Sequence, residues 1–526
     1  MNSIIKTIFS KNQNESVHQL IYFICLCLLI ASLPTSYFMI SVSLLLMSIN
    51  WLAERNYKEK IQRFLNNKPA IILASIYLVY IVGMIWTSNW KNGLGFELQN
   101  KLPIFGLTFI IASSKALSKE RLLALPIIFS LSVLVTTLIG TYFYLTKEII
   151  DTRELSPFVV HIYLSMMIVL VIFMMPDAIR KITHNKKWFY ASLIASLWLL
   201  FYLLLLSSLT GLLCLIVVIA YYSFRYIFFT KGIVKKVIAI LTILALAVFV
   251  FIIAFTIASP LTRKINPDNE EMKELTKEGN KYNHNSLNPA RENGYFIFYY
   301  VAENELREAW EERSNFNFYD RGATGQKIQF TAYRYLTSKG LRKDRESLSS
   351  LTDEEISAIE NGIANYLYLQ WPHPLVRIHK VLWEVQEYNR TGNPSGHTLT
   401  QRMDLWRASW AAFKELPLLG WGTGDILEAL DYGLTKINSS LENRNMKPHN
   451  QILSILLMVG IIGLIIISSQ IYFFIKKSNA LKHIHFKILC IIFLVSIFSL
   501  SPIDSAVGLN FLLFFSLYYG LMCIED

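Results

Sequence analysis

The feature that most constrains this chain is the recurrence of apolar segments long enough to cross a lipid bilayer. A hydrocarbon core about 30 Å thick needs about 20 predominantly apolar residues in a helix. Such segments recur through the 526 residues, of which 53% are hydrophobic and only 17% charged. Because backbone groups inside a bilayer must be paired within the segment itself, we expect helices. The predicted fold class is therefore all-α, a polytopic membrane protein.

Length and apolarity predict about twelve transmembrane helices. Pro34 and Ser207–Ser208 mark tight hairpins between neighbouring spans. The predicted spans cover residues 19–35, 36–53, 70–87, 102–113, 122–145, 157–176, 188–206, 208–228, 236–258, 449–475, 484–500 and 507–523. This gives spans one to nine in residues 1–258, one large loop in residues 259–448, and spans ten to twelve in residues 449–526.

Basic residues predict the orientation of the chain. Lysines and arginines concentrate in alternate connections between the spans, for example at residues 180–187. Because such connections stay on the cytoplasmic side, we expect both termini in the cytoplasm and the loop at residues 259–448 outside it. The same bias accounts for the formal net charge of +12, so the charge indicates no nucleic-acid partner. No cleavage site follows the first apolar segment, and no removable signal peptide is predicted.

The large loop is predicted to be helical and functional, because a long connection in a membrane protein normally has structure of its own. Thr352 and Glu355 form a capping-box pattern at the start of one helix. Amphipathic patterns predict further helices at residues 302–313, 328–336, 374–388 and 400–416. A proline- and glycine-rich sequence at residues 417–425 is predicted to turn the chain after the last of them.

Polar residues that could take part in catalysis or binding stand at the outer ends of the predicted spans. They are Arg153, His161, Arg402, His449 and Asp504. No predicted span carries a charged residue near its middle, which is unlike an ion-coupled transporter. Four of these residues also have a structural explanation: Arg153 as an interfacial anchor, His161 as a packing residue, Arg402 as the partner of a loop acid, and His449 as an interfacial residue of an ordinary span.

Metal and nucleotide chemistry are not predicted. The five cysteines fall inside apolar segments, and the outer face has no carboxylate cluster. His483 and His485 are two residues apart and face away from each other on a helix, so a metal site there is not favoured. The sequence at residues 420–425 lacks the preceding strand of a nucleotide-binding loop and favours a tight turn. We therefore expect neither a metal nor another cofactor.

Two sequences near the end of the loop carry a family resemblance. QRMDLWRASWAAFKELPLLGWGTGD, followed by KPHNQILSILLMVGIIG, resembles the signature region of the O-antigen ligase and polymerase superfamily (WaaL/Wzy type). The family pattern has an arginine-bearing helix with tryptophans, a proline, a glycine-rich turn, a spacer, then His-Asn, nine residues and Gly-x-x-Gly. His449, Asn450, Gly460 and Gly463 meet the last spacing in full. The two glycines are expected to let another helix approach closely.

A second, weaker match and one departure concern the arginines. RELSPFVVHIYLSM, which begins at Arg153, resembles the family's arginine-bearing outer loop ahead of a span. Members often carry Ser-Arg-Thr-Gly at the top of a span, whereas this chain has Ser208-Leu209-Thr210-Gly211. If the missing arginine binds substrate in relatives, another must serve here, and Arg153 is the candidate.

The resemblance implies a GT-C-like glycosyltransferase in the bacterial inner membrane. It implies transfer of a polyprenyl-diphosphate-linked glycan to lipid A–core oligosaccharide on the outer face, with inversion and without metal or ATP. The partners are then the lipid-linked donor, the lipid A–core acceptor and the bilayer. His449 would be the general base, with its pKa lowered by neighbouring arginines, and Arg402 and Arg153 would stabilise the diphosphate. The residues expected to bind substrate are Asn450, Arg407, His161, Asp504, Gly422 and Gly424.

Four alternatives stay open. A polymerase would add glycan to glycan, and a protein O-oligosaccharyltransferase would glycosylate serine or threonine, both with similar chemistry. An exporter of glycan or lipid belongs to a different class and would need polar groups inside the spans. A non-catalytic membrane anchor whose loop binds partners would be excluded if loss of His449 alone abolished activity.

Overall fold

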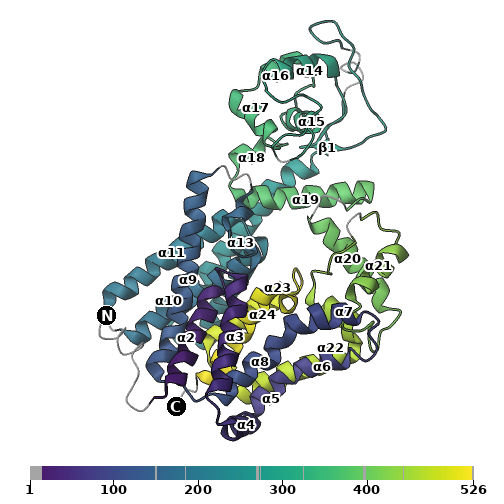
Figure 1. Ribbon diagram of the computed structural model, residues 1–526. Coiled ribbons are helices and arrows are strands. Elements are labelled where there is room, and N and C mark those ends of the chain that lie inside the picture. Colours follow the sequence, from purple (N-terminus) through teal and green to yellow (C-terminus); the bar gives the residue numbers. More distant parts are fainter. Residues whose placement is uncertain are drawn as a thin grey trace. The chain divides into compact units, whose positions relative to one another are not determined.

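The computed structural model describes residues 15–147, 151–183, 185–267, 272, 274–323, 325–394, 398–441 and 444–523. Helices make up most of the described chain (Figure 1), as the sequence predicts. A short antiparallel sheet pairs β1 (Arg291–Glu292) with β2 (Tyr295–Phe296). The protein is thus a mostly helical, multi-pass membrane protein.

The chain divides into two compact units. The first unit comprises Met1–Ile149, Arg153–Tyr221 and Gly392–Asp526, and the second unit comprises Ile150–Thr152 and Tyr222–Thr391. The C-terminal part of the predicted outer loop therefore groups with the apolar helices of the first unit. Conversely, the apolar helix α13 (Ile233–Thr262) groups with the rest of the loop.

The first unit is built from helices of very different length. Its N-terminal elements are α2 (Val17–Ser32), α3 (Tyr37–Ala53), α4 (Tyr57–Asn66), α5 (Lys68–Ala74), α6 (Ile76–Val82), α7 (Trp90–Asn92), the π-helix η1 (Gly93–Leu98), α8 (Gln99–Ser113) and α9 (Lys119–Thr146). Next come the 3-10 turn η2 (Thr152–Leu155), α10 (His161–Ile182), α11 (Lys186–Leu206) and α12 (Leu209–Phe229), of which η2 and α12 extend across the unit boundary. Its C-terminal elements are α20 (Thr398–Phe413), α21 (Ile426–Lys436), α22 (Gln451–Ser478), η4 (Ala480–Lys482), α23 (Ile484–Ser496), η5 (Pro502–Asp504), α24 (Ala506–Leu517) and η6 (Tyr518–Met522).

Six helices in the described part of the chain are long and apolar enough to cross a membrane individually. They are α9, α10, α11, α12, α13 and α22. A seventh span results if α3 and α4 are taken together, although they meet at a 118° bend. Arg55 and Asn56 cause this bend, because both adopt left-handed backbone conformations. The other predicted spans fall on shorter helices. Helix length and composition in the described residues therefore support fewer spans than the twelve predicted.

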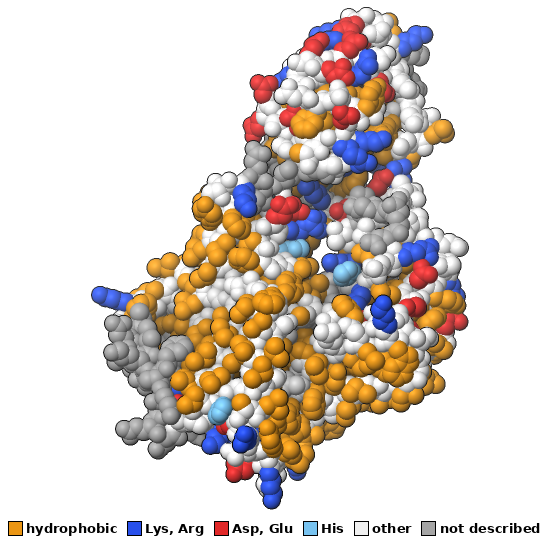
Figure 2. Space-filling model, in the orientation of Figure 1, with side chains coloured by type: hydrophobic (Ala, Val, Ile, Leu, Met, Phe, Trp, Pro, Cys, Tyr) orange, Lys and Arg blue, Asp and Glu red, His pale blue; other side chains and the backbone are white. Residues whose placement is uncertain are grey.

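Apolar side chains cover a broad face of the helices of the first unit (Figure 2). Ile194, Leu197 and Phe201 of α11 are all exposed. In the second unit, α13 is almost entirely exposed although it is strongly apolar. Contiguous apolar surfaces of this size do not face water in soluble proteins. They mark the surfaces that lipid covers.

The second unit has its own hydrophobic core. After α13, β1 and β2 it contains α14 (Glu303–Glu311), α15 (Ile328–Ser338), α16 (Arg345–Ser349), α17 (Asp353–Glu360), α18 (Leu367–Gln370) and α19 (His373–Thr391). Trp310 of α14 is fully buried, and its indole N–H donates to the Phe316 carbonyl at 2.8 Å. Thr352 and Glu355 form the predicted capping box. The other predicted loop helices fall on α14, α15, α19 and α20, whereas α16, α18 and α21 have no counterpart in the prediction.

Candidate active site

The long helix α22 is broken in its first half, and another segment of the chain fills the break. Gly460 has φ +64° and ψ −167°, a conformation that glycine tolerates best. Backbone hydrogen bonds run to this point from the proline- and glycine-rich segment after α20. They join Trp421 N–H to Leu457 O (2.7 Å), Gly422 N–H to Met458 O (3.1 Å), Ile461 N–H to Pro417 O (2.9 Å) and Ile462 N–H to Leu418 O (3.2 Å).

This packing corrects the expectation that a helix approaches Gly460. The neighbour is the segment Pro417–Gly422, and a Cβ on Gly460 would lie 2.2 Å from the Leu418 carbonyl oxygen. Gly420, with φ +73°, approaches from the other side. The two halves of the signature therefore touch, and together they fix α20 against α22.

The glycine-rich turn after α20 packs on the chain between α6 and α7. A Cβ on Gly422 would lie 2.8 Å from Thr87 Cα, and one on Gly424 would lie 2.3 Å from Asn89 O. Asp425 accepts hydrogen bonds from the N–H groups of Ser88 and Asn89, both at 2.6 Å. Close packing thus accounts for both glycines, and the predicted contact of Gly422 and Gly424 with substrate stays a prediction.

His449 lies at the head of α22 in a strained conformation. Its φ is +51°, in the left-handed region that few non-glycine residues occupy. Strain of this kind clusters at functional sites. Asn450 follows as the N-cap, and its side-chain oxygen accepts from Leu453 N–H at 3.1 Å. The structure gives Asn450 a capping role, and its predicted contact with substrate is a separate expectation.

Helix α20 contacts the residue before His449. The Trp406 indole N–H donates to the Pro448 carbonyl at 3.0 Å and so ties α20 to the residue before His449. Burial, together with the positive charges of Arg402 and Lys447, lowers the pKa of His449 to about 4. The imidazole is therefore neutral near pH 7 and able to accept a proton.

Arg407 lies on another face of α20. Its side chain is 64% exposed, and it forms an ion pair with buried Asp404 at 3.4 Å. These contacts do not link Arg407 to Arg402 or His449, and its predicted contact with substrate stays a prediction.

Four charged side chains form a cluster beside the His449 segment. Lys101 Nζ lies 2.8 Å from Glu97 Oε2 and 2.8 Å from Asp504 Oδ1, and Lys447 Nζ lies 2.7 Å from Glu97 Oε1. Glu97, Lys101 and Asp504 have buried side chains, while that of Lys447 is 20% exposed. Burial raises the pKa of Asp504, but Lys101 and Lys447 outweigh that effect and hold it below its usual value.

Glu97, Lys101 and Lys447 are absent from the residues that the sequence predicts for the site. An acid and a lysine four residues apart at the start of an apolar helix are typical of a paired face, and this spacing was the available signal. Lys447 stands inside the His-Asn signature itself. Asp504 is a predicted residue, and the structure places it against Lys101 rather than at an open surface.

Arg153 and His161 lie near the start of α10. Arg153 belongs to η2 and His161 is the first residue of α10, and both are half-buried. Among the described residues, the cations whose charges lower the pKa of His449 are Arg402 and Lys447. The structure thus brings Arg402 to His449, and the assignments of Arg153 and His161 stay predictions.

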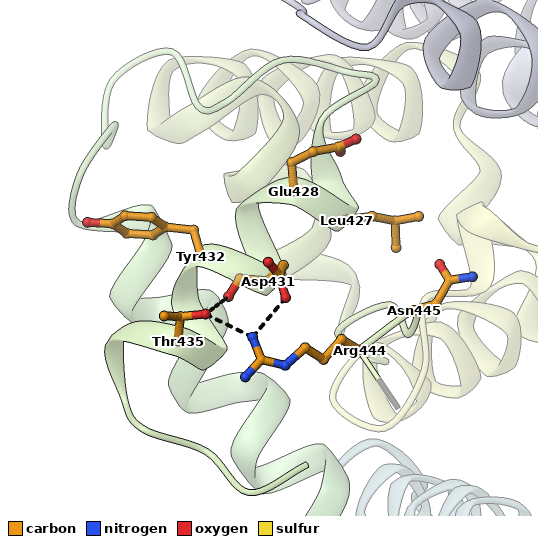
Figure 3. A pocket seen from close by; sticks show the side chains of 7 residues that line it. All are labelled: Leu427, Glu428, Asp431, Tyr432, Thr435, Arg444 and Asn445. Atoms are coloured by element: carbon orange, nitrogen blue, oxygen red, sulfur yellow. Dashed lines mark hydrogen bonds and ion pairs between the residues drawn. The ribbon is translucent and has the colours of Figure 1, made fainter. Parts of the chain in front are cut away.

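A surface depression of about 610 Å³ lies on α21 and on the segment that leads to His449 (Figure 3). The Arg444 guanidinium donates to Asp431 at 2.9 Å and to the Thr435 hydroxyl at 2.8 Å. Tyr432 lines the depression, and its ring packs 5.1 Å from that of Trp421. These contacts hold the chain on α21 five residues before His449.

Across the described residues, no group of three or more His, Cys, Asp or Glu side chains is placed to hold a metal ion.

Comparison with known families gives one match that covers this site. Residues 362–468 match the Wzy_C family model, described as O-antigen ligase. The matched range runs from the end of the second unit into α22 and includes Arg402, the glycine-rich turn and His449. It confirms the resemblance drawn from the sequence. A search of curated proteins gives no match.

Proposed function

We propose that the chain is a membrane glycosyltransferase, on the premise that its residues 362–468 match the O-antigen ligase (Wzy_C) family model. The proposed reaction transfers a polyprenyl-diphosphate-linked glycan to lipid A–core oligosaccharide on the outer face of the bacterial inner membrane. The observation that supports the proposal is the strained backbone of His449 at the head of a broken helix, within the matched range, where burial and the positive charges of Arg402 and Lys447 lower the pKa of its imidazole to about 4.

The chemistry assigns one role to each of these side chains. The acceptor hydroxyl oxygen attacks the anomeric carbon of the donor sugar while the bond from that carbon to the diphosphate oxygen breaks. His449 takes the hydroxyl proton, and the polyprenyl diphosphate leaves with the negative charge. Arg402 stabilises that charge, because its planar guanidinium donates to two phosphate oxygens at once. Attack opposite the leaving group inverts the anomeric centre, and in the proposed scheme no metal takes part.

The acceptor distinguishes this function from its alternatives. A polymerase and a protein O-oligosaccharyltransferase would use the same donor and the same two side chains. A deletion strain separates them by the electrophoretic profile of its lipopolysaccharide. Loss of all capped forms with accumulation of lipid-linked polymer supports a ligase, whereas survival of a form with one repeat unit supports a polymerase. An unchanged profile would argue for a protein acceptor.

The mechanism is tested with His449→Gln in the purified protein at matched expression. Loss of the base should lower the transfer rate by about 10²–10⁴-fold and leave donor binding largely intact. Arg402→Ala should reduce both transfer and donor binding, and Arg402→Lys should restore little because an ammonium group lacks the planar fork. Transfer near the wild-type rate in His449→Gln would refute the base assignment. Wild-type transfer in EDTA is expected, and loss that magnesium reverses would refute a metal-free mechanism.

The proposed topology is tested by cysteine labelling of the loop. Leu287 is 93% exposed and suits the purpose. The five native cysteines are buried or half-buried, so the background is low. Leu287→Cys should react with a membrane-impermeant maleimide in intact spheroplasts. Labelling only after lysis would place the loop in the cytoplasm and overturn the scheme.

A further inference from the structure

We propose that Glu97 is a positioning residue for glycosyl transfer, because it joins Lys447, two residues before His449, to the buried ion pairs of Lys101 and Asp504. The inference rests on the proposed function. It assigns Glu97 no contact with substrate. Its role is to fix the backbone and the charge beside the base.

The geometry uses both oxygens of one carboxylate. Glu97 Oε2 faces Lys101 at 2.8 Å and Glu97 Oε1 faces Lys447 at 2.7 Å. Glu97 lies in η1, a six-residue π-helix at the start of α8. Short π-helical turns are frequent at functional sites. The adjacent Phe96 contributes as well, since its ring lies 4.9 Å from Lys447 Nζ.

Stability alone is a weak explanation for the cluster. Taking four ionised groups out of water is expensive, and well-packed apolar residues often stabilise a protein as much as a buried ion pair does. Here the two carboxylates and the two ammonium groups cancel in charge. Of the four, Lys447 is the partly exposed member, and it stands in the His449 segment. The ion pairs therefore reach the segment that contains His449 and can fix its position.

The tripeptide Lys447–His449 is held from two sides. Trp406 of α20 binds the Pro448 carbonyl, and Glu97 of η1 binds the Lys447 side chain. A residue between two such anchors can be kept in the left-handed conformation that His449 adopts. Release of the Glu97 anchor should let the segment relax and move the imidazole away from the acceptor hydroxyl.

A double-mutant cycle on Glu97 and Lys447 tests the connection. Glu97→Gln and Lys447→Met should each lower kcat by about 10–100-fold, since small misplacements of a catalytic group have effects of this size. The donor KM should change far less. The double variant should be no slower than the slower single variant, because both changes remove one interaction. Independent, multiplicative losses would overturn the inference.

The pH dependence of kcat/KM provides a second test, because a residue that only stabilised the fold would not change it. Among the described residues, the charged groups that act on His449 are Arg402 from α20 and Lys447 from its own segment, and Lys447 in turn pairs with Glu97 and acts on Asp504. Lys447→Met removes one of the two cations, so the pKa of His449 should rise from about 4 towards its usual value. The acid limb of kcat/KM should then move to higher pH. An unmoved limb would overturn the inference.

The same shift can be read without activity. Diethyl pyrocarbonate modifies the neutral imidazole, and mass spectrometry of the peptide that contains His449 reports its titration. Lys447→Met should raise the midpoint of this titration, and Lys447→Arg, which keeps the charge, should not. A raised midpoint in Lys447→Arg would show that packing around the side chain, and not its charge, controls His449.

Controls separate this inference from folding and from the proposed function. Glu415→Gln removes an exposed ion pair with Lys436 in the same unit and should leave kcat unchanged. If Glu97→Gln does not accumulate, Glu97→Asp keeps the charge on a shorter side chain. Reduced kcat in that variant supports positioning, and wild-type kcat overturns it. An inactive His449→Gln combined with a fully active Glu97→Gln would refute this inference alone.

Discussion

The two units each contain a histidine whose pKa is lowered by burial and by neighbouring cations, yet the two differ in access and in backbone conformation. In the second unit, burial and the neighbouring Arg334 lower the pKa of His379 to about 4. In the first unit, burial and the cations Arg402 and Lys447 do the same for His449. The family match covers both histidines. Neither the pKa nor the match distinguishes them.

Access and backbone conformation distinguish the two histidines. His379 lies in the middle of α19, is 1% exposed, and packs against the rings of Tyr368 and Trp371. Its Nδ1 atom is 3.0 Å from the Tyr368 hydroxyl. His449 stands at the end of a helix, half-buried and with a positive φ. A lowered pKa marks burial beside a cation, and only an approachable imidazole can serve a substrate.

The largest expected effect comes from making the same substitution at the two histidines. His379→Gln should leave the transfer rate close to wild type, because the enclosed ring of His379 meets no substrate. His449→Gln should lower the rate by about 10²–10⁴-fold. Parallel assays of both variants at matched expression measure the contrast. Equal losses in the two would show that burial, and not access, determines the effect.

A second comparison between the units concerns two buried carboxylates, Glu97 in the first unit and Glu292 in the second. Glu292 in the second unit pairs with Arg334 at 2.9 Å and accepts from the Asn365 amide at 2.6 Å. Glu292→Gln should destabilise that unit by about 3–5 kcal/mol, since it leaves a guanidinium without its charge partner. Hydrogen exchange in residues 292–365 measures the loss. Transfer at a temperature where the unit stays folded should be unchanged, and a fall in kcat equal to that of Glu97→Gln would erase the distinction.

The sequence predicts the long spans well and the broken ones poorly. Helices α9 to α13 and α22 fall on predicted spans because uninterrupted apolar length is a local property. Helix α3 ends at residue 53, as predicted, and the chain then turns through left-handed conformations at Arg55 and Asn56 into α4, a helix that is not predicted from the sequence. The break in α22 at Gly460 is likewise hidden, because it is stabilised by backbone groups from a segment 40 residues away.

For the site, spacing finds the residues that are close in sequence. His449 and Arg402 stand in a recognisable pattern, and in the structure the charge of Arg402 helps to lower the pKa of His449. Glu97 and Lys101 lie hundreds of residues from Lys447, and Asp504 comes from yet another turn. Their cluster exists only after the helices pack, so a reading of local patterns cannot assemble it. It can only note that an acid and a lysine are four residues apart.

The smallest expected effect concerns the buried lysines. Lys101 of the first unit lies between two carboxylates, whereas Lys343 of the second unit donates to the carbonyls of Phe296 and Tyr299 at 3.3 and 3.0 Å. Burial lowers the pKa of Lys343 from 10.5 to about 7, and the nearby Asp344 only partly opposes the shift. Between these two values the unfolded chain holds a proton that the folded unit has released.

The unfolded state therefore binds more protons in that window, and the stability of the second unit should rise with pH from about 7 to about 10.5. Lys343→Met should flatten this dependence, while Lys277→Met, at an exposed lysine, should keep it. The measurement is the free energy of opening of α14 and α15 by hydrogen exchange, corrected for the intrinsic pH dependence of exchange. A wild-type slope that Lys343→Met leaves intact would mean that Lys343 stays charged in the folded unit. Lys343 and Lys101 would then both be charged, and they would differ only in the oxygens that their ammonium groups contact.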